Sequence, residues 1–555
     1  MPGSIFVNAT ARPLLWLNTL RYLQARQIVC RPVAKLRRRI PARPIVEQAH
    51  LRDDYRERRT YFPAQPMRIS HGNFVFAEIS CPLLREEIWQ DRTKPQLWLY
   101  NVNYLDYLSE LADDSAAHLI DRWIEHNSDS RTIGWDPYPV SRRVASLLRW
   151  ITQRGAGPQP RWLASIYAQA RHLAANLEYH LMANHLMENA RALVFAGLMF
   201  RGSEAERWRA VGRAIVRQQL REQVLADGGH FERSPMYHSI VLEGLLDLIN
   251  FGDRLDRDFV RDLGDAASRM LRHLKRVVHP DGQLALLNDS VHDVAPAPAE
   301  LLAYGRRLGL LGGDEHERGW SRESGLAFVR DQEQGHYVVA DLGPIGPDYQ
   351  PGHAHADTLS FELSLFGRRV IVDSGVSDYA ASAARRRARS TLAHNTVVVD
   401  DADQSEMWSA FRVARRAYPF GQRFRARPGI VCFGASHKGY LRLSQPCIHR
   451  RRFRWRRGAL AVTDQIVGRG EHRAQSLLHL HPEVRGDLIA PAELRLSGSD
   501  GRELAMVRAR SGLRWHRRET VYSPTLGQEI PNQVWSLKSA GCLPLAMGYE
   551  ISWPE

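Results

Sequence analysis

The spacing of apolar positions divides this chain into two parts that meet near residue 315. In the first part, apolar residues recur at intervals of three and four, which is the period of amphipathic helices. This spacing predicts helices over 140–151, 162–177, 186–199, 207–225 and 240–251. No repeat of fixed length joins them, which argues against a regular solenoid. We therefore expect successive helical hairpins that pack on one another.

After Gly325 the alternation changes to a period of two, as in half-buried strands. The predicted strands cover 337–340, 359–365, 369–372, 396–399 and 460–466, and 366–368 joins two of them as a hairpin turn. Prolines and glycines at 296–298 and 311–313 mark the change of pattern. We expect a basic arm over 1–45, a helical domain over 46–312 and an antiparallel sheet domain, arranged as a sandwich, over 313–555.

Charge adds a preference for certain partners. The 555 residues are 44% hydrophobic and 25% charged, as in ordinary globular proteins. There are 76 Lys and Arg against 61 Asp and Glu, a net charge of +15. Such a surface favours nucleic acid, anionic lipid or acidic polysaccharide. Arginines dominate, which suits bidentate contact with carboxylate, sulfate or phosphate, although a GC-rich genome explains part of the excess equally well.

Several classes of protein are excluded or disfavoured. The five cysteines are scattered and lack C-x-x-C spacing, so they indicate neither a disulfide framework nor a thiolate metal site. No apolar run approaches the roughly 20 residues that span a bilayer. The apolar patch at 14–20 lacks the flanks of a signal peptide. The basic segment at 31–43 is expected to be solvated, with a membrane surface or a polyanion as the alternative contact.

One stretch carries the clearest candidate chemistry. His353 and His355 lie two residues apart and lead directly into a predicted strand, so their side chains project to the same side if the strand extends that far back. Asp373 directly follows the predicted strand 369–372, and His394 lies two residues before the predicted strand 396–399. Together they form a candidate two-His, one-Asp zinc site with a spare histidine beside it.

A second cluster begins one of the predicted helices. Asn184, His185 and Glu188 combine an amide, an imidazole and a carboxylate. Because His185 and Glu188 are three residues apart, they lie on one helical face, where the carboxylate can orient the imidazole and raise its pKa. An N-cap Asn followed by a buried His is the simpler interpretation.

A third cluster spans 227–238. Ser234 and Pro235 predict a helix start, which places Tyr237 in the first turn, where the helix N-terminus favours a phenolate. Tyr237 in a packing role is the alternative. Trp135 and Arg142 supply an aromatic face and a cation of the kind found in sugar-binding clefts, with aromatic core as the equally good alternative.

These groups match the needs of one reaction. β-Elimination at a uronic acid requires neutralisation of the carboxylate, a base for the C5 proton and an acid for the departing oxygen. An Asn or His, a Tyr and a further His provide such groups. No Asp/Glu pair stands out as expected of a glycoside hydrolase.

From about residue 95 to residue 500 the chain resembles the heparinase II/III-like polysaccharide lyases, a group that includes alginate and oligoalginate lyases. The resemblance rests on the content and the order of the segments 184–189, 234–238, 352–357, 372–375 and 394–397. It implies an incomplete (α/α) toroid followed by an antiparallel β-sandwich, with the substrate cleft between them. The segment 21–28 is similar to that of relatives associated with exopolysaccharide gene clusters.

The resemblance also implies roles. Asn184 and His185 would neutralise the uronate, with Glu188 tuning His185. Tyr237 would be the base and also a candidate for the acid, and His353 would assist from the opposite wall. The remaining implied roles are substrate contacts from Trp135, Arg142, His238 and Tyr379, with Tyr379 also a candidate acid, and structural zinc held by His355, Asp373 and His394.

The expected function is therefore a polysaccharide lyase acting on a uronic-acid-containing anionic polymer. The alternatives are a catalytically weak glycan-binding or polymer-editing protein of exopolysaccharide export and a zinc hydrolase. The arginine run at 450–457 suggests nucleic acid, but its alternation favours a strand with a cationic outer face, so no nucleic-acid partner is expected. The resemblance implies a periplasmic or secreted protein, whereas the absence of a signal pattern favours the cytoplasm.

Overall fold

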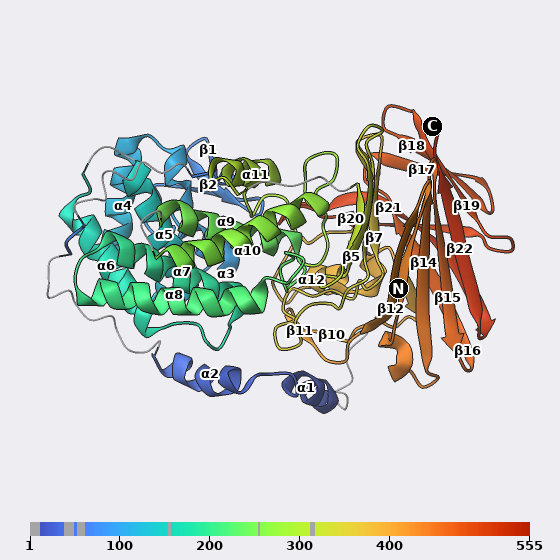
Figure 1. Cartoon of the computed structure of the whole chain (residues 1–555), viewed down its shortest axis with the longest axis horizontal. Helices are drawn as coiled ribbons and strands as arrows, with labels where there is room; N and C mark the ends of the chain where they lie inside the picture. Colours follow the sequence, from blue (N-terminus) through green and yellow to red (C-terminus); the bar gives the residue numbers. More distant parts are fainter. Residues whose placement is uncertain are drawn as a thin grey trace.

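The computed structural model describes residues 12–37, 49–52, 62–153, 157–252, 256–310 and 317–554. Helices fill one half of the molecule and antiparallel sheets the other (Figure 1). The change falls between α11, which ends at Arg307, and β4, which begins at Arg318. The turn expected over 311–313 lies outside the described residues.

The five predicted helices are confirmed as α5 to α9. The helices of this half are α3 (Gln96–Val102), α4 (Asp113–His126), α5 (Pro137–Gln153), α6 (Pro160–Ala175), α7 (Ala183–Met199), α8 (Ser203–Gln223), α9 (Pro235–Phe251), α10 (Arg257–Arg276) and α11 (Pro298–Arg307). A small sheet precedes them, formed by β1 (Ile69–Ser70), β2 (Asn73–Phe76) and β3 (Ile79–Pro82), which the sequence pattern did not predict.

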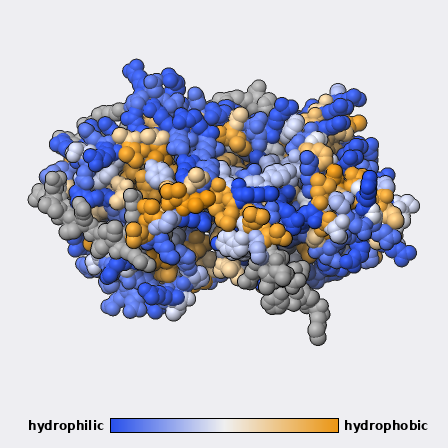
Figure 2. Space-filling view, turned by 90° about the horizontal axis from the view of Figure 1, so that it is seen from below, coloured by the Kyte–Doolittle hydropathy of each residue, from blue (hydrophilic) through white to orange (hydrophobic). Residues whose placement is uncertain are grey.

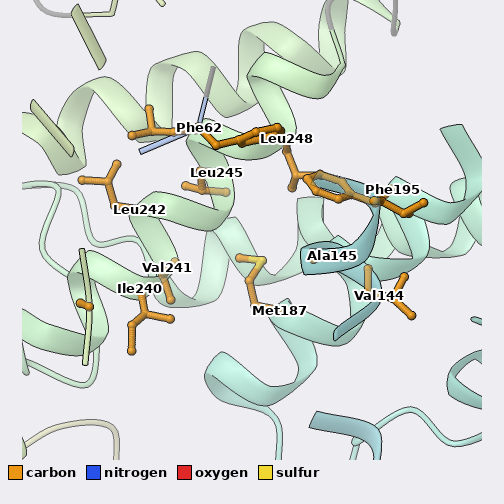
Figure 3. Packing of buried hydrophobic residues seen from close by; sticks show 14 of the residues in the cluster. Phe62, Val144, Ala145, Met187, Phe195, Ile240, Val241, Leu242, Leu245 and Leu248 are labelled. Atoms are coloured by element: carbon orange, nitrogen blue, oxygen red, sulfur yellow. The ribbon is translucent and has the colours of Figure 1, made fainter. Parts of the chain in front are cut away.

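The helices form an inner and an outer layer. Nearly every residue of α7 and α9 is buried, and α5 packs beside them. In contrast, α6, α8 and α10 bury only one face, as amphipathic outer helices do. Side chains from the three inner helices interdigitate, among them Val144, Met187 and Leu245 (Figure 3). This arrangement is the incomplete toroid that the resemblance implies.

The predicted strands are confirmed in three sheets. A five-stranded sheet contains β4 (Arg318–Ser321), β5 (Leu326–Asp331), β6 (His336–Asp341), β7 (Phe361–Leu365) and β8 (Arg368–Ile371) in chain order. Phe366 and Gly367, both with positive φ, form the predicted turn between β7 and β8. A four-stranded sheet runs in the order β20 (Trp515–Tyr522), β21 (Ile530–Cys542), β16 (Glu471–His479) and β9 (Val397–Val399).

The third sheet has eight strands and closes the sandwich. Its order is β12 (Pro419–Arg427), β13 (Ile430–His437), β14 (Cys447–Arg456), β15 (Ala459–Gly468), β22 (Leu545–Ser552), β19 (Glu503–Ala509), β18 (Glu493–Gly498) and β17 (Val484–Ala490). Its inner face packs on the five-stranded sheet, where Phe453 meets Phe361 with ring centroids 5.5 Å apart. The short helix α12 (Ala383–Arg389) and the hairpin β10 (Met407–Trp408) and β11 (Arg412–Val413) lie beside the sandwich.

The described part of the basic segment, residues 31–36, is exposed at every position except the half-buried Ala34, as expected of a solvated segment, whereas the residues before it pack on the molecule. Residues 12–37 form α1 (Arg12–Leu20) and α2 (Ala25–Arg37), which run along the lower edge of the molecule (Figure 1). The Trp408 indole N–H donates to Thr19 Oγ1 at 3.0 Å, and Gln27 donates to the Tyr349 carbonyl at 3.1 Å. Other faces of α1 and α2 expose apolar side chains, including Leu17 at 63%. Apolar surface is also visible on the lower side of the molecule (Figure 2). Residues 38–43 of the basic segment lie outside the described residues.

No helix in the described ranges has the length and apolar character that a membrane span requires.

Candidate active site

Loops from both halves of the molecule bring the predicted site residues together. Asn184 and His185 lie in the first turn of α7, and Tyr237 lies in the first turn of α9, after the predicted cap in which Ser234 Oγ accepts from the Tyr237 backbone N–H. His353 comes from the loop between β6 and β7. Its ring stacks on that of Tyr237, with centroids 3.8 Å apart and planes 29° apart. Four of the predicted catalytic residues, Asn184, His185, Tyr237 and His353, therefore share one site between toroid and sandwich.

The backbone beside this site is strained. Met182 and Ala183, immediately before Asn184, have φ of 63° and 49°. Arg233 and Asn288, each one residue before a site segment, have φ of 60° and 55°. Such left-handed conformations cost non-glycine residues about 1–3 kcal/mol each and concentrate at functional sites. Contacts with the surrounding structure must therefore hold these loops, because the backbone conformations are unfavourable for the residues themselves.

His185 has a different carboxylate partner from the one predicted. Its Nδ1 lies 3.2 Å from Oε1 of Glu178, a residue that precedes α7. Burial disfavours the charged ring, but the Glu178 carboxylate outweighs it and raises the pKa of His185. The side chain is 27% exposed, so the cation remains accessible to an anionic substrate. The predicted tuning by Glu188 is a smaller effect: its field also raises the pKa of His185, but the direct partner is Glu178.

Glu188 belongs to a buried ionic network instead. It lies 3.1 Å from Arg191 and 3.7 Å from Arg142. Arg142 also lies 3.8 Å from Glu243 and is 8% exposed. Its charge is already balanced by these carboxylates, and the expected contact between Arg142 and substrate stays a prediction.

His353 is oriented by a carboxylate that the sequence pattern did not reveal. Its Nδ1 lies 2.9 Å from Oδ2 of Asp289, which also forms a buried ion pair with Arg385. A proton on Nδ1 directed at Asp289 leaves the lone pair on Nε2, where a substrate proton can be accepted. Nε2 lies 3.8 Å from Oε2 of Glu232.

Glu232 is the least expected member of the site. It is 2% exposed, and neither carboxylate oxygen has a hydrogen bond of good geometry, although the backbone N–H of Asn184 lies close enough to lower its pKa slightly. Burial raises the pKa of this carboxyl group, against the opposing fields of His353 and His185. An unsatisfied buried carboxylate is costly to the fold, and its place between two site histidines gives it an electrostatic influence on both.

Tyr237 does not behave as the sequence predicted. The first turn of a helix favours a phenolate, but burial and the neighbouring Tyr379 and Asp289 raise the pKa of Tyr237 well above its usual value. Its phenol therefore keeps its proton in the site as it stands. Tyr379 lies beside both rings: its hydroxyl interacts with that of Tyr237, and its ring centroid is 6.2 Å from that of His353, as expected of a residue that lines the site.

Two predicted substrate contacts belong to the core. Trp135 is 8% exposed, donates its indole N–H to the Asn127 carbonyl at 2.8 Å and packs against His172. His238 is 2% exposed, and its Nε2 lies 3.0 Å from the Met270 carbonyl on α10. A role in substrate binding is therefore wrong for both residues, and aromatic core is the correct interpretation of Trp135.

The predicted zinc ligands meet in the sandwich beside the site. Asp373 Oδ2 lies 2.7 Å from His394 Nδ1, and the rings of His394 and His355 have centroids 5.3 Å apart. Within the described residues, no group of three or more His, Cys, Asp or Glu side chains has the spacing of a metal site. However, His355 Nδ1, His394 Nε2 and both carboxylate oxygens of Asp357 are buried without hydrogen-bond partners. These nitrogen and oxygen donors are of the kinds that zinc binds, so the residues fit such an ion.

Comparison with known proteins accounts for this combination of fold and site. The model described as "Heparinase II/III N-terminus" matches residues 98–299, and the model described as "Heparinase II/III-like, C-terminal" matches residues 315–547. The chain belongs to the heparinase II/III-like family. The two matches meet where the helical half gives way to the sheets, and together they contain every site residue described above.

Individual relatives are distant. A heparin-sulfate lyase of Pedobacter heparinus is 24% identical over 315 residues, which are 50% of this chain and 45% of the relative. The FtsZ-localized protein C of Caulobacter vibrioides is 28% identical over 330 residues, 57% of this chain and 54% of the relative. The chain thus spans about half the length of these curated relatives. A solved structure of a heparan sulfate lyase from Pedobacter heparinus has 17% identity and a TM-score of 0.62, covering 95% of this chain and 88% of that one, which shows a shared fold.

Proposed function

We propose that this protein is a polysaccharide lyase that cleaves a uronic-acid-containing anionic polysaccharide by β-elimination. The observation that carries the proposal is the stacked pair of Tyr237 and His353, beside the protonatable His185. This arrangement supplies a proton acceptor, a proton donor and a cation within one site. Membership of the heparinase II/III-like family supports the same chemistry.

Each group has a distinct task. The His185 cation, with Asn184 beside it, binds the uronate carboxylate and offsets the charge that develops when C5 loses its proton. His353 accepts this proton on Nε2, since Asp289 occupies Nδ1. The C4–O bond breaks as the C4–C5 double bond forms, and the Tyr237 phenol protonates the departing oxygen. This assignment replaces the expectation that Tyr237 is the base, because its raised pKa keeps the proton in place.

We further propose that zinc holds the sandwich side of this site together. His355, Asp373 and His394 would be its ligands, with Asp357 as an additional candidate because both of its oxygens lack partners. The ion would supply structural cross-linking between loops of the five-stranded and four-stranded sheets. His353 is two residues from His355, so the ion would fix the loop that carries the base.

The test of the lyase proposal is the ultraviolet absorbance of the unsaturated uronate product. Purified protein would be incubated with heparan sulfate, heparin, hyaluronan, alginate and polyglucuronate, each beside the Tyr237→Phe variant. Tyr549→Phe is the matched control, since this hydroxyl is buried in the sandwich core without a partner. We expect absorbance to rise with the wild type and the control and to stay flat with Tyr237→Phe. Equal rates in all three proteins would contradict the assignment.

A glycan-binding or polymer-editing protein without elimination is the second candidate. It is favoured by the relative from Caulobacter vibrioides, whose name refers to localisation and not to a lyase. Flat absorbance on every polymer, combined with retained binding, would support it. We also infer action outside the cytoplasm, as the resemblance to lyases of external polymers suggests, which fractionation of cells carrying the tagged chain would test.

A further inference from the structure

The outer face of the eight-stranded sheet carries rows of arginines. β13 lies between β12 and β14, so residues of all three strands stand side by side. Arg423 pairs in register with Gly434, which pairs with Arg452. Two residues along, Cys432 of β13 lies between Arg425 of β12 and Arg454 of β14. The outward-facing arginines on the two sides of β13 are Arg423, Arg425, Arg450, Arg452 and Arg454. The arginine run seen in the sequence is thus a strand with a cationic outer face, as predicted.

The middle strand leaves space between these arginines. Its outward positions within the groove are the small residues Cys432, Gly434 and Ser436, and the exposed Ile430 lies beyond the groove at the start of the strand. A side chain at Gly434 is excluded because its Cβ would lie 2.3 Å from the Arg451 carbonyl oxygen. The result is a groove of about 810 Å³ with β13 as its floor. Its walls stand two strand spacings apart, roughly 10 Å, which is the width of one extended chain.

The arginines of the groove lack acidic partners. Throughout the described residues, no carboxylate lies within ion-pair distance of Arg423, Arg425, Arg450 or Arg452. Arg454 approaches Glu550 only to 4.0 Å. The inward-facing arginine of β14 differs, since Arg451 pairs with Asp464 at 2.7 Å. Neighbouring cations without counter-charges repel one another, and a bound polyanion would relieve that repulsion.

We propose that this groove, defined by Arg423, Arg425, Arg450, Arg452 and Arg454 over the β13 floor, is a second binding site for a single chain of anionic polysaccharide. It is separate from the catalytic site, because the inner face of the same sheet packs on the five-stranded sheet. Guanidinium forks match carboxylates and sulfates bidentately. The identity of the polymer rests on the proposed function, whereas the groove and its charge are properties of the structure alone.

Other polyanions fit the groove less well. A nucleic-acid duplex is wider than the groove, whose floor is the single strand β13. Single-stranded nucleic acid is usually held by stacking on aromatic side chains, and of the aromatic lining residues Phe433 and Phe453 are buried, which leaves Phe420. An anionic membrane surface would attract the arginines by charge alone, and the vesicle probe below distinguishes it from a single polymer chain that enters the groove.

Cys432 allows a direct test, because its exposed thiol lies on the groove floor. Cys542, also exposed but on β21, is an internal control in the same molecule. The full chain carrying Tyr237→Phe, which is designed to bind without turnover, would be alkylated with N-ethylmaleimide, with and without size-defined heparin oligosaccharides. We expect heparin to slow modification of Cys432 and leave Cys542 unchanged. Unchanged or equal protection of both thiols would overturn the proposal.

Variants separate the groove from general charge. Arg425→Gln/Arg450→Gln/Arg452→Gln should weaken heparin binding roughly tenfold or more. Arg485→Gln/Arg495→Gln/Arg508→Gln removes the same charge from exposed positions of β17, β18 and β19 and should have a much smaller effect. Equal losses in both triple variants would contradict a defined site. The thiol-protection experiment is repeated with dextran as an uncharged polymer, with duplex DNA, and with vesicles of phosphatidylserine and phosphatidylcholine. Protection of Cys432 by DNA or vesicles but not by heparin would also overturn the proposal.

This experiment is independent of the lyase assay. Protection of Cys432 with flat absorbance would support the groove and contradict the proposed catalysis. Lyase activity without protection of Cys432 would support the proposed catalysis and contradict the groove as a binding site.

Discussion

Nδ1 of His185 lies 3.2 Å from Oε1 of Glu178, a carboxylate seven residues earlier in the chain. The candidate at helical spacing, Glu188, faces Arg191 and Arg142 instead. Glu178 also accepts a hydrogen bond from the Asn189 side chain at 3.0 Å, which fixes its position. The loop before α7 and the helix itself therefore hold the imidazolium together.

This relationship predicts different effects for two carboxylate variants. Glu178→Gln removes the anion that raises the pKa of His185, so the cationic ring is lost at lower pH. If turnover requires the His185 cation, the alkaline limb of the pH–rate profile moves to lower pH. Loss of a hydrogen bond to a charged group costs about 1.5–3 kcal/mol, or roughly 10–100-fold in kcat/KM. The measurement is the pH profile of product absorbance.

Glu188→Gln is the matched comparison. Its field raises the pKa of His185 less than the directly bonded Glu178 does, so the alkaline limb should move less than in Glu178→Gln, while stability falls because Arg191 and Arg142 lose a buried partner. The same shift of the limb in both variants would show that Glu178 has no special role.

The helices and strands could be predicted because burial imposes a period on the sequence, as it does along α7 and β14. The partners of His185 and His353 could not. Glu178 and Asp289 lie in loops, where no period applies, and their contacts depend on how the two halves meet. Glu232 lay within a segment already singled out, but its unsatisfied burial is a property of the tertiary structure.

Glu232→Gln should stabilise the fold while reducing activity. A carboxyl group whose pKa is raised on folding binds its proton more tightly in the folded state, so stability falls as pH rises from its unfolded pKa through its folded pKa. The neutral amide removes this loss, and we expect a gain of about 1 kcal/mol at neutral pH that disappears in acid.

The same variant removes an anion 3.8 Å from His353 Nε2, which favours the imidazolium formed when that nitrogen accepts a proton. We expect kcat to fall roughly tenfold or more. Urea unfolding at several pH values and initial rates measure the two effects. Glu206→Gln, exposed on α8, is the control. Lower stability than the wild type at neutral pH would contradict this account of Glu232.

The zinc proposal predicts a metal content of about one ion per chain in protein purified without chelators. Removal of the ion should lower the midpoint of thermal unfolding, because buried donor atoms of His355, His394 and Asp357 would lose their partner. His394→Gln should abolish zinc binding. His472→Gln alters a similar histidine–aspartate pair, 2.7 Å from Asp400, and should keep the zinc. Elemental analysis measures the zinc content and thermal unfolding measures the midpoint. A protein that contains no metal after purification, or whose midpoint does not change when the metal is removed, would contradict the proposal.

The buried pair of Arg451 and Asp464 should contribute far more to stability than an exposed pair on the same sheet. Arg451 donates to both Asp464 oxygens, at 2.7 and 2.9 Å, and to the Leu359 carbonyl at 3.0 Å. It thereby joins β14, whose outer face forms the arginine groove, to the segment before β7. Asp464→Asn leaves a buried guanidinium without a counter-charge, so the free energy of unfolding should fall by roughly 3–5 kcal/mol. Asp487→Asn, which breaks the exposed pair with Arg485, should cost at most about 1 kcal/mol.

The pH dependence follows from the same pair. Although burial opposes ionisation, Arg451 lowers the pKa of Asp464 below its usual value. The stabilisation is therefore present above the unfolded pKa of an aspartate, about 3.9, and is lost as pH falls toward the lower folded pKa. The difference in unfolding free energy between the wild type and Asp464→Asn should shrink in that acidic range. In the double variant Arg451→Met/Asp464→Asn no charge remains unpaired, so part of the stability should return. Urea unfolding of the wild type, Asp464→Asn, Arg451→Met and the double variant completes the test, and additive losses in the double variant would mean that the pair does not act as a unit.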